Sequence, residues 1–415
     1  MIDRQPPDGT PPARPWTPSR AQVAIFSPDS FGLGHFRRSM LIAERLLDEP
    51  AITAVLLITG SPVAERFPRR PGIELVPLPG VTKDHLGRYC SADDDSPIED
   101  VLRRRGVVAA DAVRAHRPAV VLVDHSPTGL DGELRAMLDE LAPDRRRPTL
   151  VLGMREIIDD ADRVRADWER SGAFDAVANR YDHVLVYGDP TIETTAHELG
   201  LEGIARGPVE YVGYVARTMP SHSPPSDTER PRILVTVGGG ADGRRLLDTY
   251  ARALAGLGPS ADFTSTILTG PMLSAPDRAE IEHQLRATGA DIELEMFTNS
   301  PETLMASSTG VIAMGGYNTV TELMALGAPA LIVPREFPRR EQRLRAERLG
   351  DLGAIDWELD ELLTARRLRT FVTTARRAGT RRPIVDLEGV RTTVERISAM
   401  VRERERPPLS FTPTH

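Results

Sequence analysis

The sequence contains a single cysteine, Cys90, among its 415 residues. One cysteine excludes an intrachain disulfide, which fits a reducing, cytoplasmic environment. An excess of basic residues is also missing, since the net charge is −8, and this argues against a general nucleic-acid-binding role. Apolar runs such as residues 51–60 reach about half the length that a membrane-spanning helix needs. These absences predict a cytoplasmic protein that binds no nucleic acid; peripheral membrane contact and oligomeric state are left open.

The two ends of the chain differ in composition from the rest. Residues 1–20 are rich in proline and contain no apolar segment of the length found in signal peptides. Residues 405–415 are similarly polar and proline-containing. We therefore predict a disordered leader and a disordered tail.

Between these ends, short apolar runs alternate with amphipathic stretches in two series. Such alternation is typical of a parallel sheet with helices on both faces. Prolines and serines interrupt the pattern once, which marks a linker and a hinge. The prediction is an α/β protein of two doubly wound, Rossmann-like domains that face each other across a cleft, with ligands at the carboxyl ends of the strands. The expected segments are a first domain over 21–215, a linker over 216–230, a second domain over 231–384, and a helix over 385–404 that crosses back to the first domain.

A glycine triplet follows the first apolar run of the second series. Gly238, Gly239 and Gly240 end the run, and a helix pattern begins near Gly243. Backbone amides of adjacent glycines can approach a phosphate closely, and the helix N-terminus adds a partial positive charge. The triplet therefore predicts a pyrophosphate site, although an ordinary tight turn has the same composition.

A second glycine pair, Gly315 and Gly316, stands between a strand pattern and a helix expected to start at Asn318 or Thr319, and all four residues are predicted to contact the donor. Glu322 lies early in this helix, where a carboxylate is favoured electrostatically and can also contact a bound ribose. Further on, Glu341 and Gln342 mark the start of another helix, where their side chains can bind hydroxyl groups.

Residues 233–350, and above all "GGYNTVTELMALGAPALIVPREFPRREQRLRAERL", resemble the donor-binding half of GT-B glycosyltransferases of the glycosyltransferase 28 group. This group includes the N-acetylglucosaminyltransferase that completes lipid II, and the segment is most similar to a branch known only as predicted glycosyltransferases. The resemblance implies a nucleoside-diphosphate sugar as donor, UDP being the nucleotide expected, and no further cofactor. It also implies roles for individual residues: Glu322 binds the ribose diol, Phe297 and Thr298 lie where the backbone reads uracil, the glycines of both loops surround the diphosphate, and Glu341 with Gln342 contact the sugar hydroxyls.

Two departures from that family leave the donor sugar and base open. Met314 stands where the lipid II enzyme has an arginine. Glu341 stands where that enzyme has the first of two glutamines.

The loop "SFGLGHFRR" at residues 30–38 is glycine-rich as well, but it does not complete a dinucleotide fingerprint. Arg37 occupies the third glycine position, and no acidic residue follows at the spacing that a ribose-binding carboxylate requires. In enzymes of the resembled family this loop faces the acceptor. His35 is therefore the leading candidate for the general base, with Asp124 as the carboxylate that orients it. A helix-capping role for His35, a turn-forming role for Asp124, and an exchange of roles between His35 and His125 are the alternatives.

Other polar residues fall at the same predicted sheet edge. Arg155 and Glu156 end a strand pattern, and we expect either acceptor contacts or surface ion pairs there. Arg37 and Arg38 are candidates for contact with an anionic acceptor or the donor phosphate. The acidic run at 93–95 leads into a helix pattern, which argues against a metal-binding pair, and no zinc-type spacing of His and Cys is present, so no metal site is predicted.

Together these features predict an inverting, metal-independent glycosyltransferase of the hexosyltransferase class. Its acceptor is a small molecule, a glycan or a lipid-linked compound, and closure about the linker excludes water. The alternatives are a nucleotide-sugar 2-epimerase on the same fold and a non-catalytic sugar-nucleotide-binding subunit.

Overall fold

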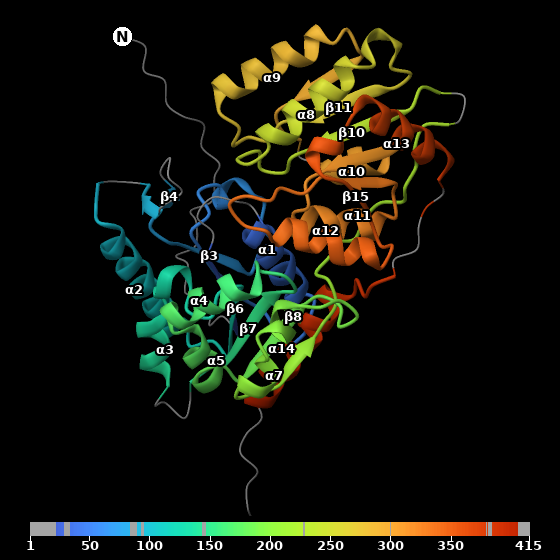
Figure 1. Ribbon diagram of the computed structural model, residues 1–415. Helices are drawn as coiled ribbons and strands as arrows, with labels where there is room; N and C mark the ends of the chain where they lie inside the picture. Colours follow the sequence, from blue (N-terminus) through green and yellow to red (C-terminus); the bar gives the residue numbers. More distant parts are fainter. Residues whose placement is uncertain are drawn as a thin grey trace, which may run out of the picture.

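The computed structural model describes residues 22–28, 34–83, 89–92, 95–142, 147–226, 229–298, 300–378, 380 and 384–405. The predicted leader, nearly all of the predicted tail and residues 30–33 of the glycine-rich loop lie outside this range, as do Asp93 and Asp94. Two domains, one above the other in Figure 1, each consist of a parallel sheet covered by helices.

The first domain is built on a seven-stranded sheet with the order β3-β2-β1-β6-β7-β8-β9, in which every pair of neighbours is parallel. Its strands are β1 (Val23–Ser27), β2 (Val55–Thr59), β3 (Ile73–Pro77), β6 (Val120–Asp124), β7 (Thr149–Arg155), β8 (His183–Tyr187) and β9 (Val209–Tyr211). Its helices are α1 (Gly34–Leu46), α2 (Ile98–His116), α3 (Arg135–Leu141), α4 (Ala161–Ser171), α5 (Ala173–Asn179), α6 (Thr195–Glu198) and α7 (Leu201–Ile204).

Two local features of this domain differ from the sequence pattern. The helix-like stretch after β2 forms only a short 3-10 turn, Ala64–Arg66. An antiparallel hairpin of β4 (Val81–Lys83) and β5 (Tyr89–Ser91), which the pattern did not indicate, precedes α2.

The second domain repeats the same topology with a six-stranded sheet of order β12-β11-β10-β13-β14-β15. Both sheets thus follow the order 3-2-1-4-5-6 of the doubly wound fold, which confirms the predicted fold class. The strands are β10 (Arg232–Thr236), β11 (Thr264–Leu268), β12 (Ile292–Glu295), β13 (Gly310–Ala313), β14 (Ala330–Ile332) and β15 (Asp356–Trp357). The helices are α8 (Arg244–Ala255), α9 (Ala275–Ala287), α10 (Pro301–Ala306), α11 (Tyr317–Leu326), α12 (Glu341–Asp351) and α13 (Ala365–Arg377).

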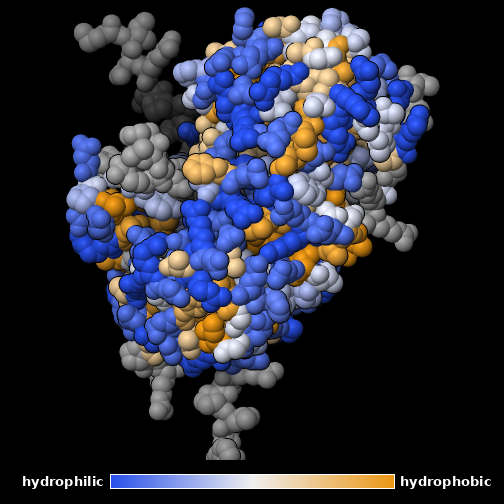
Figure 2. Space-filling view, in the orientation of Figure 1, coloured by the Kyte–Doolittle hydropathy of each residue, from blue (hydrophilic) through white to orange (hydrophobic). Residues whose placement is uncertain are grey.

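The central strands are buried along nearly their whole length and are mostly apolar, because helices cover both faces of each sheet. In β1, Val23 and Ile25 pack into one buried cluster, while Ala24 and Phe26 pack into another on the opposite face. Continuous apolar runs are what two-sided burial requires, whereas a half-exposed strand would alternate. The outer surface differs: the face in Figure 2 is mostly hydrophilic, with its apolar residues in small groups. No helix among the described residues is long and apolar enough to cross a membrane.

The last helix, α14 (Gly389–Glu405), packs against α1 and lies with the first domain (Figure 1). The chain reaches it beside the end of the first domain, where the Tyr214 amide donates to the Asp386 carbonyl at 2.8 Å. An antiparallel bridge joins Val215 to Glu388 at the same place. The chain therefore passes between the domains twice, and the two passages run side by side.

The segment expected to be a linker is bound to the second domain at its middle. The Ser223 amide donates to the Ala306 carbonyl at 2.8 Å, and the His222 ring contacts the Ser308 carbonyl at 2.9 Å. Residues 222–223 therefore belong to the surface of the second domain, and the first passage between the domains lies before them in the chain.

A buried ion pair joins the two domains. Arg345 of α12 and Glu156, which follows β7, are both inaccessible to solvent, and the guanidinium donates to the Glu156 carboxylate. Arg345 also donates to the carbonyls of Gly315 and Ile157, at 3.0 and 3.2 Å. Glu156 was expected to contact the acceptor or form a surface pair, and both expectations are wrong because α12 covers it.

Candidate active site

A cavity of about 790 Å³ lies between the two domains at the carboxyl ends of both sheets. Side chains of the first domain, including His35, His125 and Arg155, line one wall. The glycine loop at 238–240 and residues of α11 and α12 line the other. The cavity therefore lies in the predicted cleft.

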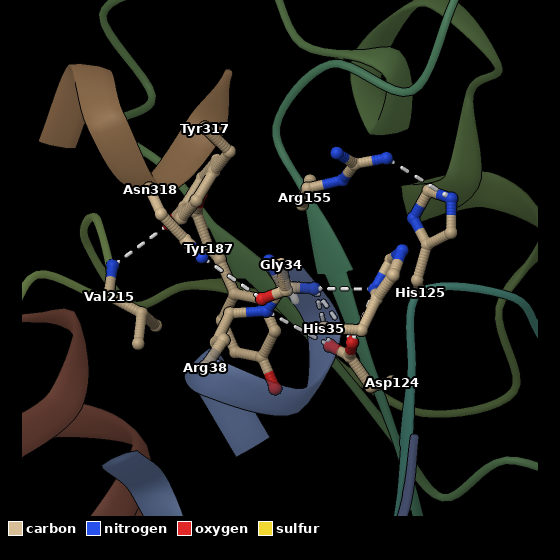
Figure 3. A network of polar contacts seen from close by, with 10 residues as sticks. All are labelled: Gly34, His35, Arg38, Asp124, His125, Arg155, Tyr187, Val215, Tyr317 and Asn318. Atoms are coloured by element: carbon tan, nitrogen blue, oxygen red, sulfur yellow. Dashed lines mark hydrogen bonds and ion pairs between the residues drawn. The ribbon is translucent and has the colours of Figure 1, made fainter. Parts of the chain in front are cut away.

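On the wall of the first domain, His35 and Asp124 are hydrogen-bonded (Figure 3). His35 Nδ1 lies 2.7 Å from Asp124 Oδ2. Arg38, one turn further along α1, donates to both oxygens of the same carboxylate, with Nη2 at 2.7 Å from Oδ2. Asp124 and Arg38 are each only 2% exposed, whereas His35 is 24% exposed. Since Asp124 accepts from the Nδ1 side, His35 presents Nε2 to the cavity.

The rings of two tyrosines hold Arg38 in this position. Its guanidinium lies 5.4 Å from the ring centre of Tyr187 and 5.3 Å from that of Tyr317. The Tyr317 hydroxyl donates to the Tyr187 carbonyl at 3.0 Å and accepts from the Val215 amide at 2.9 Å. Tyr317 belongs to the second domain, so this stacking ties the histidine–aspartate pair to the docking of the two domains.

The surroundings keep His35 neutral at physiological pH. Burial is the main cause that lowers its pKa to about 4, with the nearby cations Arg38 and Arg155 adding to it, while Asp124 opposes the shift. Burial alone would raise the pKa of Asp124, but Arg38 and the bond from His35 keep it below the usual value. A neutral imidazole beside an ionised carboxylate is the state in which a histidine can accept a proton.

His125 and Arg155 extend this wall of the cavity. The His125 ring lies 4.8 Å from the ring of His35, and Arg155 Nη2 lies 3.4 Å from His125 Nε2 (Figure 3). His125 has a backbone φ of 72°, a left-handed conformation that is unusual for a residue with a side chain. Among the hydrogen bonds of the described residues, none joins His125 to a carboxylate, so His35 is the better-oriented base of the two.

The opposite wall contains open backbone at two of the predicted glycines. Gly238 has φ 63°, and neither at Gly238 nor at Gly316 would a Cβ meet another atom within 4 Å. At Gly240 a Cβ would lie 2.5 Å from the Thr269 carbonyl, so this glycine is needed for packing. Gly239 also lines the cavity, whereas Gly315 does not: its carbonyl and α-carbon face α12. Four of the five predicted loop glycines therefore line the cavity.

Glu322 lies in the second turn of α11 and is buried against the cavity wall. Its carboxylate is paired across the domain boundary with Arg37 Nη2 at 2.9 Å, and Arg217 lies 3.5 Å away. Burial raises the pKa of Glu322, and the two arginines oppose that rise. Arg37 was expected to contact an anionic acceptor or the donor phosphate. In the structure it pairs instead with Glu322, the carboxylate predicted to bind the ribose.

Glu341 and Gln342 begin α12, and Arg335 organises both. Arg335 Nη2 donates to Glu341 Oε1 at 2.7 Å, and its amide donates to Gln342 Oε1 at 3.3 Å. The second oxygen of Glu341 is buried and has no hydrogen-bond partner among the described residues. Arg335 also pairs at 3.1 Å with Asp242 of the glycine loop, which links the expected sugar and phosphate positions.

The remaining predicted donor residues lie around the same opening. Phe297 is 48% exposed and lines the cavity together with Thr298 and Thr319. Asn318 also lines it, but its side-chain amide donates to the Gly34 carbonyl at 3.1 Å, across the domain boundary. Within the described parts of the chain, no group of three or more His, Cys, Asp or Glu side chains is arranged to hold a metal ion.

Sequence reasoning did not identify Arg38, Arg335 and Tyr317 as organisers of this site. Arg38 was recognisable only as a possible ligand for an anion, because its true partner is 86 residues away. Tyr317 directly follows the second glycine pair, and this position beside a predicted ligand-binding loop was the only feature of the sequence that pointed to it.

Two Rossmann-like domains with a cavity between the carboxyl ends of their strands define the GT-B class of folds. A solved structure of Acinetobacter baumannii MurG is 14% identical, covers 92% of this chain and 99% of its own, and has a TM-score of 0.52. A Listeria monocytogenes protein, provisionally assigned as a UDP-N-acetylglucosamine 2-epimerase, is 14% identical with a TM-score of 0.60, and covers 94% of this chain and 99% of its own. These likenesses show the fold.

The model of the glycosyltransferase family 28 C-terminal domain matches residues 233–382, which make up nearly all of the second domain. This match confirms the resemblance expected from residues 233–350. A Brucella anthropi UDP-N-acetylglucosamine–N-acetylmuramyl-(pentapeptide) pyrophosphoryl-undecaprenol N-acetylglucosamine transferase is 29% identical over 135 residues, 32% of this chain. The chain spans about a third of the length of this curated relative, 35%.

Proposed function

We propose that this protein is an inverting glycosyltransferase that transfers a sugar from a nucleoside-diphosphate donor, UDP-sugar being the leading candidate, to a hydroxyl group of an acceptor. The observation that carries the proposal is that the two domains line one cavity with different groups. An oriented neutral histidine faces open glycine backbone in a domain of family 28.

In the proposed reaction, His35 Nε2 takes the proton of the acceptor hydroxyl as the oxygen attacks the anomeric carbon. The new glycosidic bond forms as the bond from that carbon to the phosphate oxygen breaks, and the nucleoside diphosphate leaves with the electron pair. Asp124 stabilises the imidazolium that forms. Amides of the loops at 238–240 and 316, together with the N-termini of α8 and α11, stabilise the charge on the diphosphate, so the mechanism needs no metal ion.

Glu322 is proposed to bind the ribose diol, with Phe297 and Thr298 beside the base and Glu341 with Gln342 at the sugar. The free oxygen of Glu341 accepts a sugar hydroxyl in this assignment. Because Glu322 is paired with Arg37 in the structure, donor binding would compete for one contact between the domains.

The direct test is incubation with a panel of UDP- and dTDP-sugars and a broad set of hydroxyl acceptors, with products identified by mass spectrometry. We expect transfer from an α-linked donor to give a β-linked product, and EDTA to leave the rate unchanged. Retention of the α configuration would contradict the inverting mechanism, and loss of activity on EDTA treatment would contradict metal independence.

A 2-epimerase is the second candidate, supported by the Listeria neighbour and by the unpaired carboxylate oxygen of Glu341 near the expected sugar position. Incubation with labelled nucleotide sugar in the absence of any acceptor distinguishes the two. Conversion to the C2 epimer would support the epimerase and overturn the transferase.

A further inference from the structure

The first-domain wall of the cavity contains an arginine, Arg155, that forms no ion pair within the described residues. Arg155, at the end of β7, lines the cavity, and its one side-chain hydrogen bond within the described residues is the 3.4 Å contact with His125 Nε2. Its Nε atom is buried without a partner. Burial and the cations Arg38 and Arg345 lower the pKa of Arg155 to about 10, while the carboxylates of Glu341 and Glu156 oppose the shift, and Arg155 stays charged at neutral pH. A half-buried guanidinium without an ion pair is costly, and this cost favours an anion as the ligand of this part of the cavity.

The other arginines around the cavity differ from Arg155 in this respect. Arg38 is bound by Asp124, Arg37 by Glu322, and Arg335 by Asp242 and Glu341. Arg339, in the loop before α12, resembles Arg155 because the described residues give its side chain no ion pair. It lines the same cavity from the second domain. Its charge also contributes to lowering the pKa of His125, which places it within electrostatic reach of the same wall.

The position of Arg155 distinguishes its ligand from the donor diphosphate. The glycine loops that suit the diphosphate belong to the second domain, whereas Arg155 lies at the edge of the first sheet. His125 stands between Arg155 and His35, 4.8 Å from the ring of the proposed base. An anion held by Arg155 would therefore lie beside the group that receives the acceptor's proton.

We propose that Arg155 and His125 form an oxyanion-binding subsite of the acceptor, so that the acceptor is an acidic molecule with a carboxylate or phosphate group close to the hydroxyl that is glycosylated. This inference rests on the proposed function and specifies its acceptor class. Arg155 supplies charge and hydrogen bonds to the oxyanion, and Arg339 adds a second cation from the opposite domain.

The first test uses inorganic phosphate as the probe, with saturating UDP present to occupy the donor site. Ring signals of the nine histidines are followed by NMR after selective labelling, and His125→Asn assigns the relevant signal. Phosphate should shift the His125 signal in the wild type and in Arg114→Gln, a control in which an exposed ion pair with Glu140 is removed. Arg155→Gln should abolish the shift without changing UDP affinity.

Three results would overturn the subsite. A phosphate effect that disappears when UDP is added would assign the anion to the donor site. Equal phosphate titrations of wild type and Arg155→Gln would identify an adventitious ion only. A loss of UDP affinity in Arg155→Gln would make this residue a donor ligand.

The second test compares acidic acceptors with their neutral parents, namely uronic acids and sugar phosphates against the corresponding sugars. We expect the acidic members to be preferred, and Arg155→Gln to lower their kcat/KM about 10- to 100-fold, mainly through KM, as loss of a charged hydrogen bond predicts. Arg155→Lys should recover part of the loss because it keeps the charge. The acidic acceptor would be overturned if the wild type used acidic and neutral acceptors equally well, or if Arg155→Gln left kcat/KM for the acidic acceptors unchanged.

The same experiments distinguish failure of the proposed transferase activity from failure of the acidic-acceptor subsite. If no acceptor of either kind is glycosylated although donor binds, the transferase is wrong and the phosphate titration alone decides whether Arg155 binds an anion.

Discussion

The two domains share one topology but present opposite kinds of surface to the cavity. The first sheet edge contributes side chains, with His35, His125 and Arg155 at or beside the strand ends. The second adds open glycine backbone to its side chains, at Gly238 and Gly316, with α8 and α11 starting behind it. Backbone amides suit a diphosphate that every donor carries, whereas side chains can be tailored to one acceptor. The comparison therefore predicts that mutations in the first domain affect turnover and acceptor use, and mutations in the second affect donor binding.

The largest expected effect is that of His35→Asn. Removing the proposed base should lower kcat by a factor of about 10² to 10⁴ while leaving the affinity for UDP unchanged. Steady-state transfer assays and calorimetric titration with UDP measure the two quantities. His283→Asn, on an exposed position of α9, is the matched control. Unchanged turnover in His35→Asn would remove His35 from the mechanism.

Glu322→Gln tests the other wall. Loss of the carboxylate should weaken UDP binding about 10-fold or more, since a charged hydrogen bond to the ribose is lost, and should change kcat at saturating donor much less. Glu302→Gln is a close control, because Glu302 also pairs with Arg217 but does not line the cavity. Equal UDP affinity of Glu322→Gln and Glu302→Gln would show that Glu322 serves the domain contact alone.

Gly238→Ala should weaken UDP binding by a smaller factor, roughly several-fold, because its Cβ would occupy open space in the proposed phosphate cradle and its φ of 63° is strained for alanine. Gly353→Ala has comparable strain, at φ 71°, and equally open surroundings outside the cavity. Calorimetric UDP titrations of both variants separate strain from contact. If they bind UDP equally well, the glycine loop does not approach the phosphates.

The smallest expected effect is a displaced pH profile. The base must be neutral, and burial lowers its pKa to about 4, so kcat/KM should stay level from pH 8 down to about pH 5 and fall only below that. An unperturbed histidine would lose half its activity near pH 6.5. The measurement is kcat/KM at fixed ionic strength across this range, and a midpoint near 6.5 would contradict the buried environment of His35.

Local patterns predicted the fold and most residues that line the cavity, because both depend on strand ends. A parallel strand delivers the residue after it to one known edge, which is why Asp124 and Gly238 could be placed from the sequence. The contact between His35 and Asp124 follows from that rule, since β1 and β6 are neighbours. Their proposed roles still await the measurements above.

Contacts that depend on domain docking could not be predicted. Arg37 and Glu322 are 285 residues apart, and Glu156 meets Arg345 over 189 residues. No local pattern encodes which surfaces of the two domains meet. Gly315, which stands beside Gly316 in the sequence, faces α12 of its own domain and not the cavity, and no local pattern encodes this packing either.

The double passage of the chain between the domains also determines how they can move. The bridge between Val215 and Glu388 and the bond from Tyr214 to Asp386 tie the two passages together at one edge of the interface. Two chain segments held together at one place permit rotation of the domains about that place and resist sliding there. Opening would therefore widen the side of the cavity far from this bridge first, and substrates would enter and products leave there.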